Sequence, residues 1–329
     1  MKINLNKNLK IFVKIFIFLL SIYIITFTYI QYCSIYFNDE NSNNWFYLHK
    51  VLTKEIDLKD TTIKYIFLGE SRLNSALDFK KIPYCWSFSY GGTTPVEQYF
   101  ILKKYLLNYN KPDTIFYSVS PRFISETFSF WQYAVRNDFF TNDDFNEIIS
   151  NYNSLNDTVL GNFPKIKFFL YQLNFISFYQ TDIYKNRIFL KKSNNTDAIK
   201  CIQSHKGQSM HPNLKDSCSE LNYETKYKYF TPSKLLDFYF NKILKLCSEN
   251  NIKVIFLFMP MNESSYYKLN TKFTKDYKSY MNLYQEKFPE FEISDTIYHY
   301  PNIYFGDNSH LNFSGQQKFT NQFIEKYFK

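Results

Sequence analysis

Two short polar clusters in the sequence hold residue types that together could carry out nucleophilic catalysis. The first is Gly69, Glu70, Ser71 and Arg72, directly after an apolar run. A glycine permits a tight exit from a strand, and a serine at the start of the next helix meets free backbone N–H groups that favour developing negative charge. We therefore expect Ser71 to be a nucleophile. The alternative is an ordinary helix N-cap, a position in which serine is common.

The second cluster, near the C-terminus, pairs a carboxylate with an imidazole. Asp307 lies three residues before His310, so its carboxylate can bind one imidazole nitrogen and fix the tautomer while the other nitrogen faces a nucleophile. This arrangement is typical of a general base, and we expect it to activate Ser71. The histidines that lack a nearby carboxylate in the sequence are weaker candidates: His205, His211 and His299.

The elements that must position these clusters predict a parallel sheet. Short apolar runs typical of buried strands alternate with stretches of helical periodicity. The expected strands are residues 63–68, 84–89, 114–119 and 252–258, with a weak one at 303–305. Strands separated by helices imply an α/β protein with a parallel, doubly wound sheet and helices on both faces. Polar groups at the carboxyl ends of such strands meet at one edge of the sheet, which would bring Ser71 and His310 together.

Helix signals follow the same plan. Thr94, a proline and then Glu97 form a capping-box pattern that predicts a helix start. A second helix is expected after Thr231, and a final helix close to the C-terminus. Their apolar faces are predicted to be Leu236, Phe240, Ile243, Leu244 and Cys247 for the second helix, and Phe319, Phe323 and Tyr327 for the last.

The N-terminal segment predicts a membrane anchor. Four lysines precede an uncharged run from Ile15 to Ile30. With Lys14 snorkelling, the run approaches the roughly 20 residues that span a bilayer. The lysines before the run, and Asp39 and Glu40 after it, place the N-terminus in the cytoplasm and the rest outside. The alternative is a cleaved signal peptide, but no small-residue cleavage site follows the run.

The chain accordingly divides into three parts. Residues 1–37 are expected to form a cytoplasmic tail and transmembrane anchor, residues 38–60 a polar stalk, and residues 61–329 one folded domain. A less regular stretch at about 123–230 predicts an insertion in that domain. Within it, Cys201 and Cys218 predict a disulfide that closes a local loop, as oxidation outside the cytoplasm permits. A zinc site with the nearby histidines is the alternative, although the spacing fits no common finger pattern.

The net charge of +9 limits the classes of binding partner that can be expected. The lysines are dispersed, and no basic run carries the interleaved arginine and aromatic pattern of a nucleic-acid groove, so no nucleic-acid partner is predicted. Positive charge of this kind favours anionic envelope polymers or lipid headgroups.

The two polar clusters, in this order, resemble those of the SGNH, or GDSL-like, hydrolase family. There a nucleophilic serine follows the first strand and an Asp-x-x-His pair lies near the C-terminus; Glu70 stands where the family usually has Asp. The resemblance covers the chain from about residue 63 to the end, except for the insertion. It implies a three-layer α/β/α, flavodoxin-like fold, a triad of Ser71, His310 and Asp307, and no metal or organic cofactor.

The resemblance also implies an oxyanion hole. The family's second block places a donor glycine after the second strand, which corresponds to Gly92, with Gly91 as the near alternative, beside the backbone N–H of Ser71. The third block usually supplies an asparagine, and this chain departs from it between Ser118 and Arg122. The substitute donors are Ser120, Arg122 and Arg72; for both arginines the alternative is a surface ion pair.

The anchor, the altered third block and the C-terminal cluster are similar to the envelope branch of this superfamily. That branch includes the D-alanyl-lipoteichoic-acid transfer protein and the alginate O-acetylation proteins, which work beside a membrane-bound O-acyltransferase. The implied function is that of a single-pass, extracytoplasmic serine acyltransferase or esterase. It would move an O-acetyl or other acyl group to or from a cell-surface glycan through an acyl-serine.

The N-terminal anchor implies the lipid bilayer as a partner, and the resemblance implies two more: a membrane-bound O-acyltransferase and a glycan or acyl-ester substrate. Two other functions stay open at this point. One is a plain esterase or lipase with the same triad, and the other is a non-catalytic envelope protein that binds polysaccharide or a partner enzyme.

Overall fold

A five-stranded parallel sheet forms the centre of the protein. The computed structural model describes residues 7–37, 40–58, 62–127, 129–172, 195–209 and 226–329. The strands lie in the order β2-β1-β3-β4-β6, a flavodoxin-like order. Their bounds are β1 Tyr65–Gly69, β2 Cys85–Ser89, β3 Thr114–Tyr117, β4 Lys253–Phe256 and β6 Glu292–Ile293. The predicted α/β architecture with a parallel sheet is confirmed.

Neighbouring residues of each strand face opposite sides of the sheet and enter separate cores. In the observed register Phe67 pairs with Phe116, and Phe116 with Ile255. These three side chains form a row on one face. Their immediate neighbours lie in the larger core on the other face: Ile66, Leu68, Ile115, Tyr117, Val254 and Phe256. Both faces are apolar because helices cover both.

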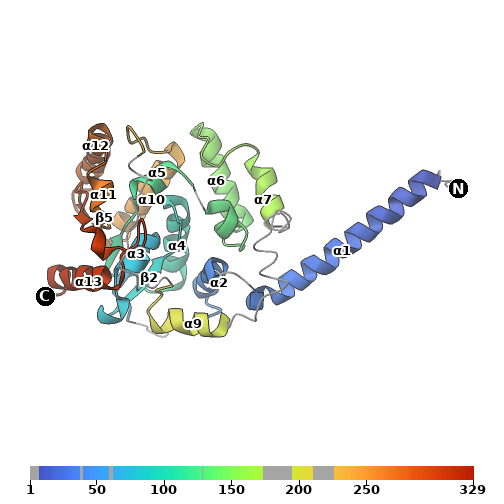
Figure 1. Cartoon of the computed structure of the whole chain (residues 1–329), viewed down its shortest axis with the longest axis horizontal. Coiled ribbons are helices and arrows are strands. Elements are labelled where there is room, and N and C mark those ends of the chain that lie inside the picture. The colour runs from blue at the N-terminus through green and yellow to red at the C-terminus, as the bar shows by residue number, and fades with distance from the viewer. Residues whose placement is uncertain (1–6, 38–39, 59–61, 128, 173–194, 210–225) are drawn as a thin grey trace.

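Helices pack on both faces of the sheet (Figure 1). The larger core takes in α4 (Pro95–Asn108), α10 (Lys234–Glu249) and α12 (Thr271–Lys287). The smaller core is covered by α3 (Ser71–Ala76), the 3₁₀ helix η1 (Phe79–Lys81) and α13 (Phe313–Tyr327). Helix α4 begins with the predicted capping box of Thr94 and Glu97. The predicted apolar face of α10 is buried, as expected from its helical spacing.

The insertion shares the larger core. Its described elements are α5 (Pro121–Ser125), the π-helix η2 (Phe130–Val135), α6 (Asn142–Ser154), α7 (Pro164–Gln172) and α9 (Asn195–Ser204). Buried side chains such as Phe130, Phe145 and Ile202 join that core. After α9 the chain runs along the outer edge of β2, where the N–H of Ser87 donates to the carbonyl of Lys206 at 2.8 Å.

The predicted disulfide cannot be followed in the described residues. Cys201 lies on α9, with its Sγ 3.6 Å from Nδ1 of His205. Cys218 and His211 lie outside the described residues. The disulfide between Cys201 and Cys218 therefore stays a prediction.

The N-terminal segment forms helix α1 (Lys7–Phe37), which extends away from the α/β domain (Figure 1). Its apolar side chains between Leu9 and Ile25 are exposed. Among the residues whose side chains the structure describes, no helix is long and apolar enough to cross a membrane. The transmembrane helix predicted within residues 1–37 is therefore not supported.

The segment expected to form a stalk is instead part of the folded domain. Residues 40–52 form helix α2 (Glu40–Leu52). Trp45, Leu48 and Leu52 lie three and four residues apart, so they share one helix face, and all three are buried in the larger core. The Trp45 ring packs against the rings of Tyr90 and Phe139.

The fifth strand also differs from the prediction. Residues 302–304 form the 3₁₀ helix η4 (Asn302–Tyr304), and Phe305 makes only an isolated antiparallel bridge to Leu311. Pro301 precedes this turn, and a proline fixes the backbone and removes an N–H donor. The strand that completes the sheet is β6, whose two residues are too short for a periodic signal. A further two-stranded sheet pairs β5 (Met261–Asn262) with β7 (His299–Tyr300).

The burial of α2 can be tested by substitution. We expect Trp45→Ala to lower the free energy of unfolding by about 3 to 5 kcal/mol, because it removes a large buried ring. The control Leu107→Ala, on an α4 side chain that is 75% exposed, should change it by about 0.5 kcal/mol or less. Chemical denaturation measures both. Equal effects would mean that α2 is a stalk after all.

Candidate active site

A line of hydrogen bonds joins the two polar clusters at the carboxyl edge of the sheet. Nε2 of His310 lies 2.9 Å from Oγ of Ser71, and Nδ1 of His310 lies 2.8 Å from Oδ2 of Asp307. When Nδ1–H donates to the carboxylate, Nε2 is left to accept the Ser71 proton. The structure therefore brings together three residues that the sequence places at opposite ends of the domain, in the arrangement that nucleophilic catalysis requires.

The electrostatics of Asp307 keep it an anion. Its side chain is 50% exposed. Burial alone would raise the pKa of this carboxyl, but the hydrogen bonds from His310 Nδ1 and from the backbone N–H groups of Ser309 and His310 lower it to about 2. A carboxylate that stays ionised near neutral pH orients the imidazole and stabilises its protonated form.

The loop that carries His310 is fixed by one hydrogen bond within the loop and by others from residues outside it. The N–H of Gly306 donates to the carbonyl of His310 at 3.0 Å. The side-chain amide of Asn262, at the end of β5, donates to the carbonyl of Asn308 at 2.9 Å. Asn312, the N-cap of α13, accepts from the N–H of Gly315 and donates to the carbonyl of Ile303. The short β5 strand and α13 thus fix the two ends of the loop.

Helix α13 is also tied directly to α3, which carries Ser71. The buried Gln316 amide donates to the carbonyls of Ser75 and Leu77, at 2.9 and 3.2 Å. One turn further on, the hydroxyl of Thr320 accepts from the N–H of Asp78 at 2.9 Å. The Gln316 bonds use carbonyls at the C-terminus of α3 that the helix leaves unpaired, and the Thr320 bond uses an N–H group just beyond it. They set the distance between Ser71 and the loop that carries His310.

Ser71 is presented at a tight exit from β1. A Cβ atom on Gly69 would lie 2.6 Å from the carbonyl oxygen of Ser118, so only glycine fits there. The next residue, Glu70, is the N-cap of α3 and accepts from the N–H of Arg72 at 2.9 Å. Ser71 is the first residue of the helix, so its role as an N-cap, the alternative from the sequence, does not apply.

A turn after β2 lies against this exit. The N–H of Tyr90 and the hydroxyl of Thr93 both bind the carbonyl of Gly69, at 3.1 and 2.7 Å. In this turn Gly92 has φ +72°, and a Cβ there would lie 1.6 Å from Oγ of Ser129. Within the described residues the N–H groups of Ser71 and Gly92 donate to no acceptor. They are the donors expected for an oxyanion hole, whereas the carbonyl of Gly91 accepts from Ser129.

The third predicted donor position, after β3, is occupied by Ser120. Its hydroxyl is buried, and among the described residues it has no hydrogen-bond partner. It lies at the carboxyl end of the strand next to β1. Arg122, on α5, pairs with Glu126 at 3.5 Å, which agrees with the ion-pair alternative. Arg72 is buried on α3 rather than at the surface.

Sequence reasoning did not assign roles to several residues that hold the site. Glu70 binds the nucleophile, since its Oε2 lies 3.2 Å from Oγ of Ser71. Asn262 and Asn312 fix the His310 loop, and both are N-cap residues. Asparagine directly before a helix is a recognisable cap signal, so these two could have been found from the sequence. The burial of Glu70 could not.

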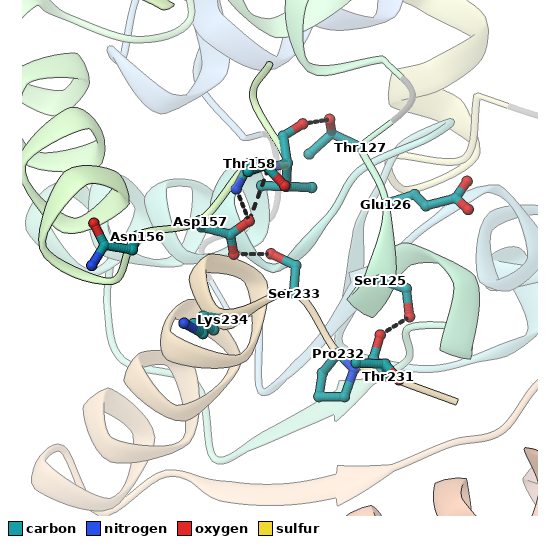
Figure 2. Close-up of a pocket in the computed structure, with 11 residues that line it drawn as sticks. Ser125, Glu126, Thr127, Asn156, Asp157, Thr158, Thr231, Pro232, Ser233 and Lys234 are labelled. Carbon is teal, nitrogen blue, oxygen red and sulfur yellow. Dashed lines mark hydrogen bonds between the residues drawn. The ribbon is translucent and has the colours of Figure 1, made fainter. Parts of the chain in front are cut away.

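Two described cavities lie away from the triad. One, of about 560 Å³, lies between the end of α5, residues 156–159 and the start of α10 (Figure 2). Asp157 in this cavity is used structurally. Burial would raise its pKa, but bonds from Ser233 Oγ and the N–H groups of Leu235, Val159 and Thr158 lower it.

The other cavity, of about 320 Å³, is lined mainly by aromatic residues beside β6 and α13. Neither cavity contains a triad residue. The triad geometry therefore marks the candidate site better than cavity volume does.

Comparison with known proteins adds no assignment: no model of a protein family matches the chain, and no curated protein matches it.

The ionisation of Asp307 gives a direct test of the pair. We expect its carboxyl to titrate near pH 2 in carbon-detected NMR, and the pKa to rise toward the ordinary value of about 3.9 in His310→Ala. Because the folded-state pKa is lowered, the stability that the pair contributes is present at neutral pH and is lost as the pH falls below about 4 toward 2. A midpoint that is the same in both proteins would show that His310 does not bind Asp307.

Proposed function

We propose that the protein is an acyl-transfer enzyme of the serine hydrolase type, in which Ser71 is the nucleophile, His310 the general base and Asp307 the group that orients it. The single observation that carries this proposal is the line of hydrogen bonds from Ser71 through His310 to Asp307. Among the described residues the N–H groups of Ser71 and Gly92 have no acceptor. This supports an acyl reaction, because such groups can bind the charge of a tetrahedral intermediate.

The first half-reaction forms an acyl-serine. Nε2 of His310 takes the proton of Ser71 as Oγ attacks the carbonyl carbon of an ester or thioester. The carbonyl oxygen becomes an oxyanion, which accepts hydrogen bonds from the N–H groups of Ser71 and Gly92. The buried hydroxyl of Ser120 is the candidate for a third donor. When the intermediate collapses, the leaving alkoxide or thiolate receives the proton from His310.

The second half-reaction releases the acyl group. A hydroxyl of the acceptor attacks the acyl carbonyl and gives its proton to His310, and Oγ of Ser71 then leaves and recovers that proton. A sugar hydroxyl as acceptor makes the enzyme a transferase, and water makes it an esterase. We propose the sugar.

Covalent acylation of Ser71 tests the proposal. Incubation with an activated acetyl ester should add one acetyl group at Ser71, detected by mass spectrometry of peptides. Ser71→Ala should lose the modification and at least about a thousandfold of the esterase rate, since the nucleophile is gone. Ser154→Ala, at the exposed end of α6, is the control and should react like the wild type. A folded wild type that is never acylated would exclude covalent catalysis and leave a binding function.

A partly exposed aromatic cluster linked to the catalytic loop supports a sugar acceptor. We call it the aromatic shelf and define it as Tyr266, Tyr267 and His299. The rings of Tyr266 and His299 stack with centroids 4.0 Å apart, and the Tyr267 ring lies edge-on to His299. Tyr267 is 73% exposed. The Tyr267 ring is exposed, and an exposed ring can pack on the apolar C–H face of a sugar. Tyr266 and His299 are half-buried and lie against it.

The shelf is joined to the catalytic loop. Helix α11 (Glu263–Tyr266) begins at Asn262, which binds the carbonyl of Asn308 in that loop. The N–H of Asn302, in η4, donates to Glu263 at 3.2 Å. A sugar that stacks on the shelf would therefore lie about one helical turn from the loop of the general base.

Loss of the shelf should affect the acceptor alone. We expect Tyr267→Ala to raise the KM for a soluble oligosaccharide acceptor by about three- to tenfold, the worth of one aromatic contact, while the rate of acetyl-ester hydrolysis stays unchanged. The control is Tyr84→Ala, a residue that is 51% exposed at the opposite end of β2. Acetate release that never depends on an acceptor would identify an esterase instead.

The setting of this reaction remains a prediction from the sequence. An extracytoplasmic location at a membrane, a partner membrane-bound O-acyltransferase and the identity of the glycan belong to this proposal. They can be tested by fractionation of the native host and by co-purification with the full chain.

A further inference from the structure

Glu70 is a buried carboxyl group in direct contact with the nucleophile. It is 0% exposed. Its Oε2 lies 3.2 Å from Oγ of Ser71 and accepts from the N–H of Arg72 at 2.9 Å. Its Oε1 is buried and has no hydrogen-bond partner within the described part of the chain. The acylation mechanism above does not use this group.

The contact gives the Ser71 hydroxyl two competing acceptors. A hydroxyl has one proton, and Oγ of Ser71 lies 2.9 Å from Nε2 of His310 and 3.2 Å from Oε2 of Glu70. Only the bond to His310 leads to reaction. A hydrogen bond to an ionised acceptor is about twice as strong as one to a neutral acceptor, so the charge of Glu70 decides how strongly it competes.

The surroundings of Glu70 favour its neutral form. Burial raises the pKa of this carboxyl, although Arg72, His310 and the hydrogen bond from Ser71 act in the opposite direction. Asp307 lies behind His310. From the adjacent strands, Ser89 at the end of β2 and Ser118 and Ser120 after β3 are buried and carry no charge. The other nearby arginine, Arg122 on α5, pairs with Glu126.

We propose that Glu70 sets the alkaline limit of catalysis: as a neutral acid it leaves the Ser71 proton to His310, and as a carboxylate it draws that proton away from the base. This inference rests on the proposed function, because it concerns the activation of the same nucleophile. Glu70 is then a positioning residue for the Ser71 proton, in addition to its role as the N-cap of α3.

The pH profile of Glu70→Gln tests the inference. In the wild type, kcat/KM for an activated acetyl ester, followed by acetate release, should fall at alkaline pH as Glu70 ionises. Glutamine keeps the capping oxygen but never ionises. The variant should stay within about tenfold of the wild type at the plateau, since the general base is intact, and should lose the alkaline fall.

Glu97→Gln is the matched control. Glu97 is also buried, on α4, and burial raises its pKa to about 7 despite hydrogen bonds to Thr94. It caps its own helix, so its substitution should change the stability and leave the alkaline fall of kcat/KM in place. Should Glu70→Gln fail to fold, NMR of the carboxyls in Glu97→Gln replaces it: with Glu97 removed, the buried Glu70 carboxyl should titrate together with the alkaline fall.

The outcomes separate this inference from the function on which it rests. A wild type that is not acylated overturns the proposed function. An active wild type whose alkaline fall persists in Glu70→Gln overturns the role of Glu70 alone. So does a Glu70→Gln variant that folds but loses about a hundredfold or more at every pH, because the charge would then assist the base.

Discussion

The contact between α3 and α13 is the constraint on which the site depends. The nucleophile follows the first strand and the base precedes the last helix, so their alignment is a matter of how two distant helices are held together. Gln316 and Thr320 provide this link by binding backbone groups at the end of α3. The smaller core beneath, in which Phe323 packs on Phe67 and Phe116, keeps the helix against the sheet.

Two carboxyl groups flank the same Ser–His pair in opposite environments. Asp307 is half exposed and accepts several hydrogen bonds, which lower its pKa. Glu70 is fully buried, its Oε1 has no hydrogen-bond partner among the described residues, and burial raises its pKa. The fold thus keeps Asp307, which binds the imidazole, ionised, and it favours the neutral form of Glu70, which contacts the hydroxyl. The different surroundings of the two carboxyl groups cause this difference.

The sequence predicts the central sheet and the catalytic pair, but not α2, the edge strand β6 or the burial of Glu70. Four of the five strands, and the meeting of Ser71 with His310, follow from apolar runs and from polar clusters at strand ends. The segment containing α2 is polar and mixed in composition, which predicts a stalk, although Trp45, Leu48 and Leu52 have a helical spacing. Strand β6 has only two residues, and the burial of Glu70 depends on tertiary packing that no local pattern encodes.

The two edge strands of the sheet, β2 and β6, affect how the protein can associate with other molecules. Along β2 an amide at the outer edge is already engaged by the chain that follows α9, and on the far side β6 offers only a two-residue edge. Exposed strand edges are templates for intermolecular pairing and hence for aggregation. Edges of this kind disfavour pairing with a strand from another molecule. Association with other molecules is therefore expected to use side chains on helices and loops.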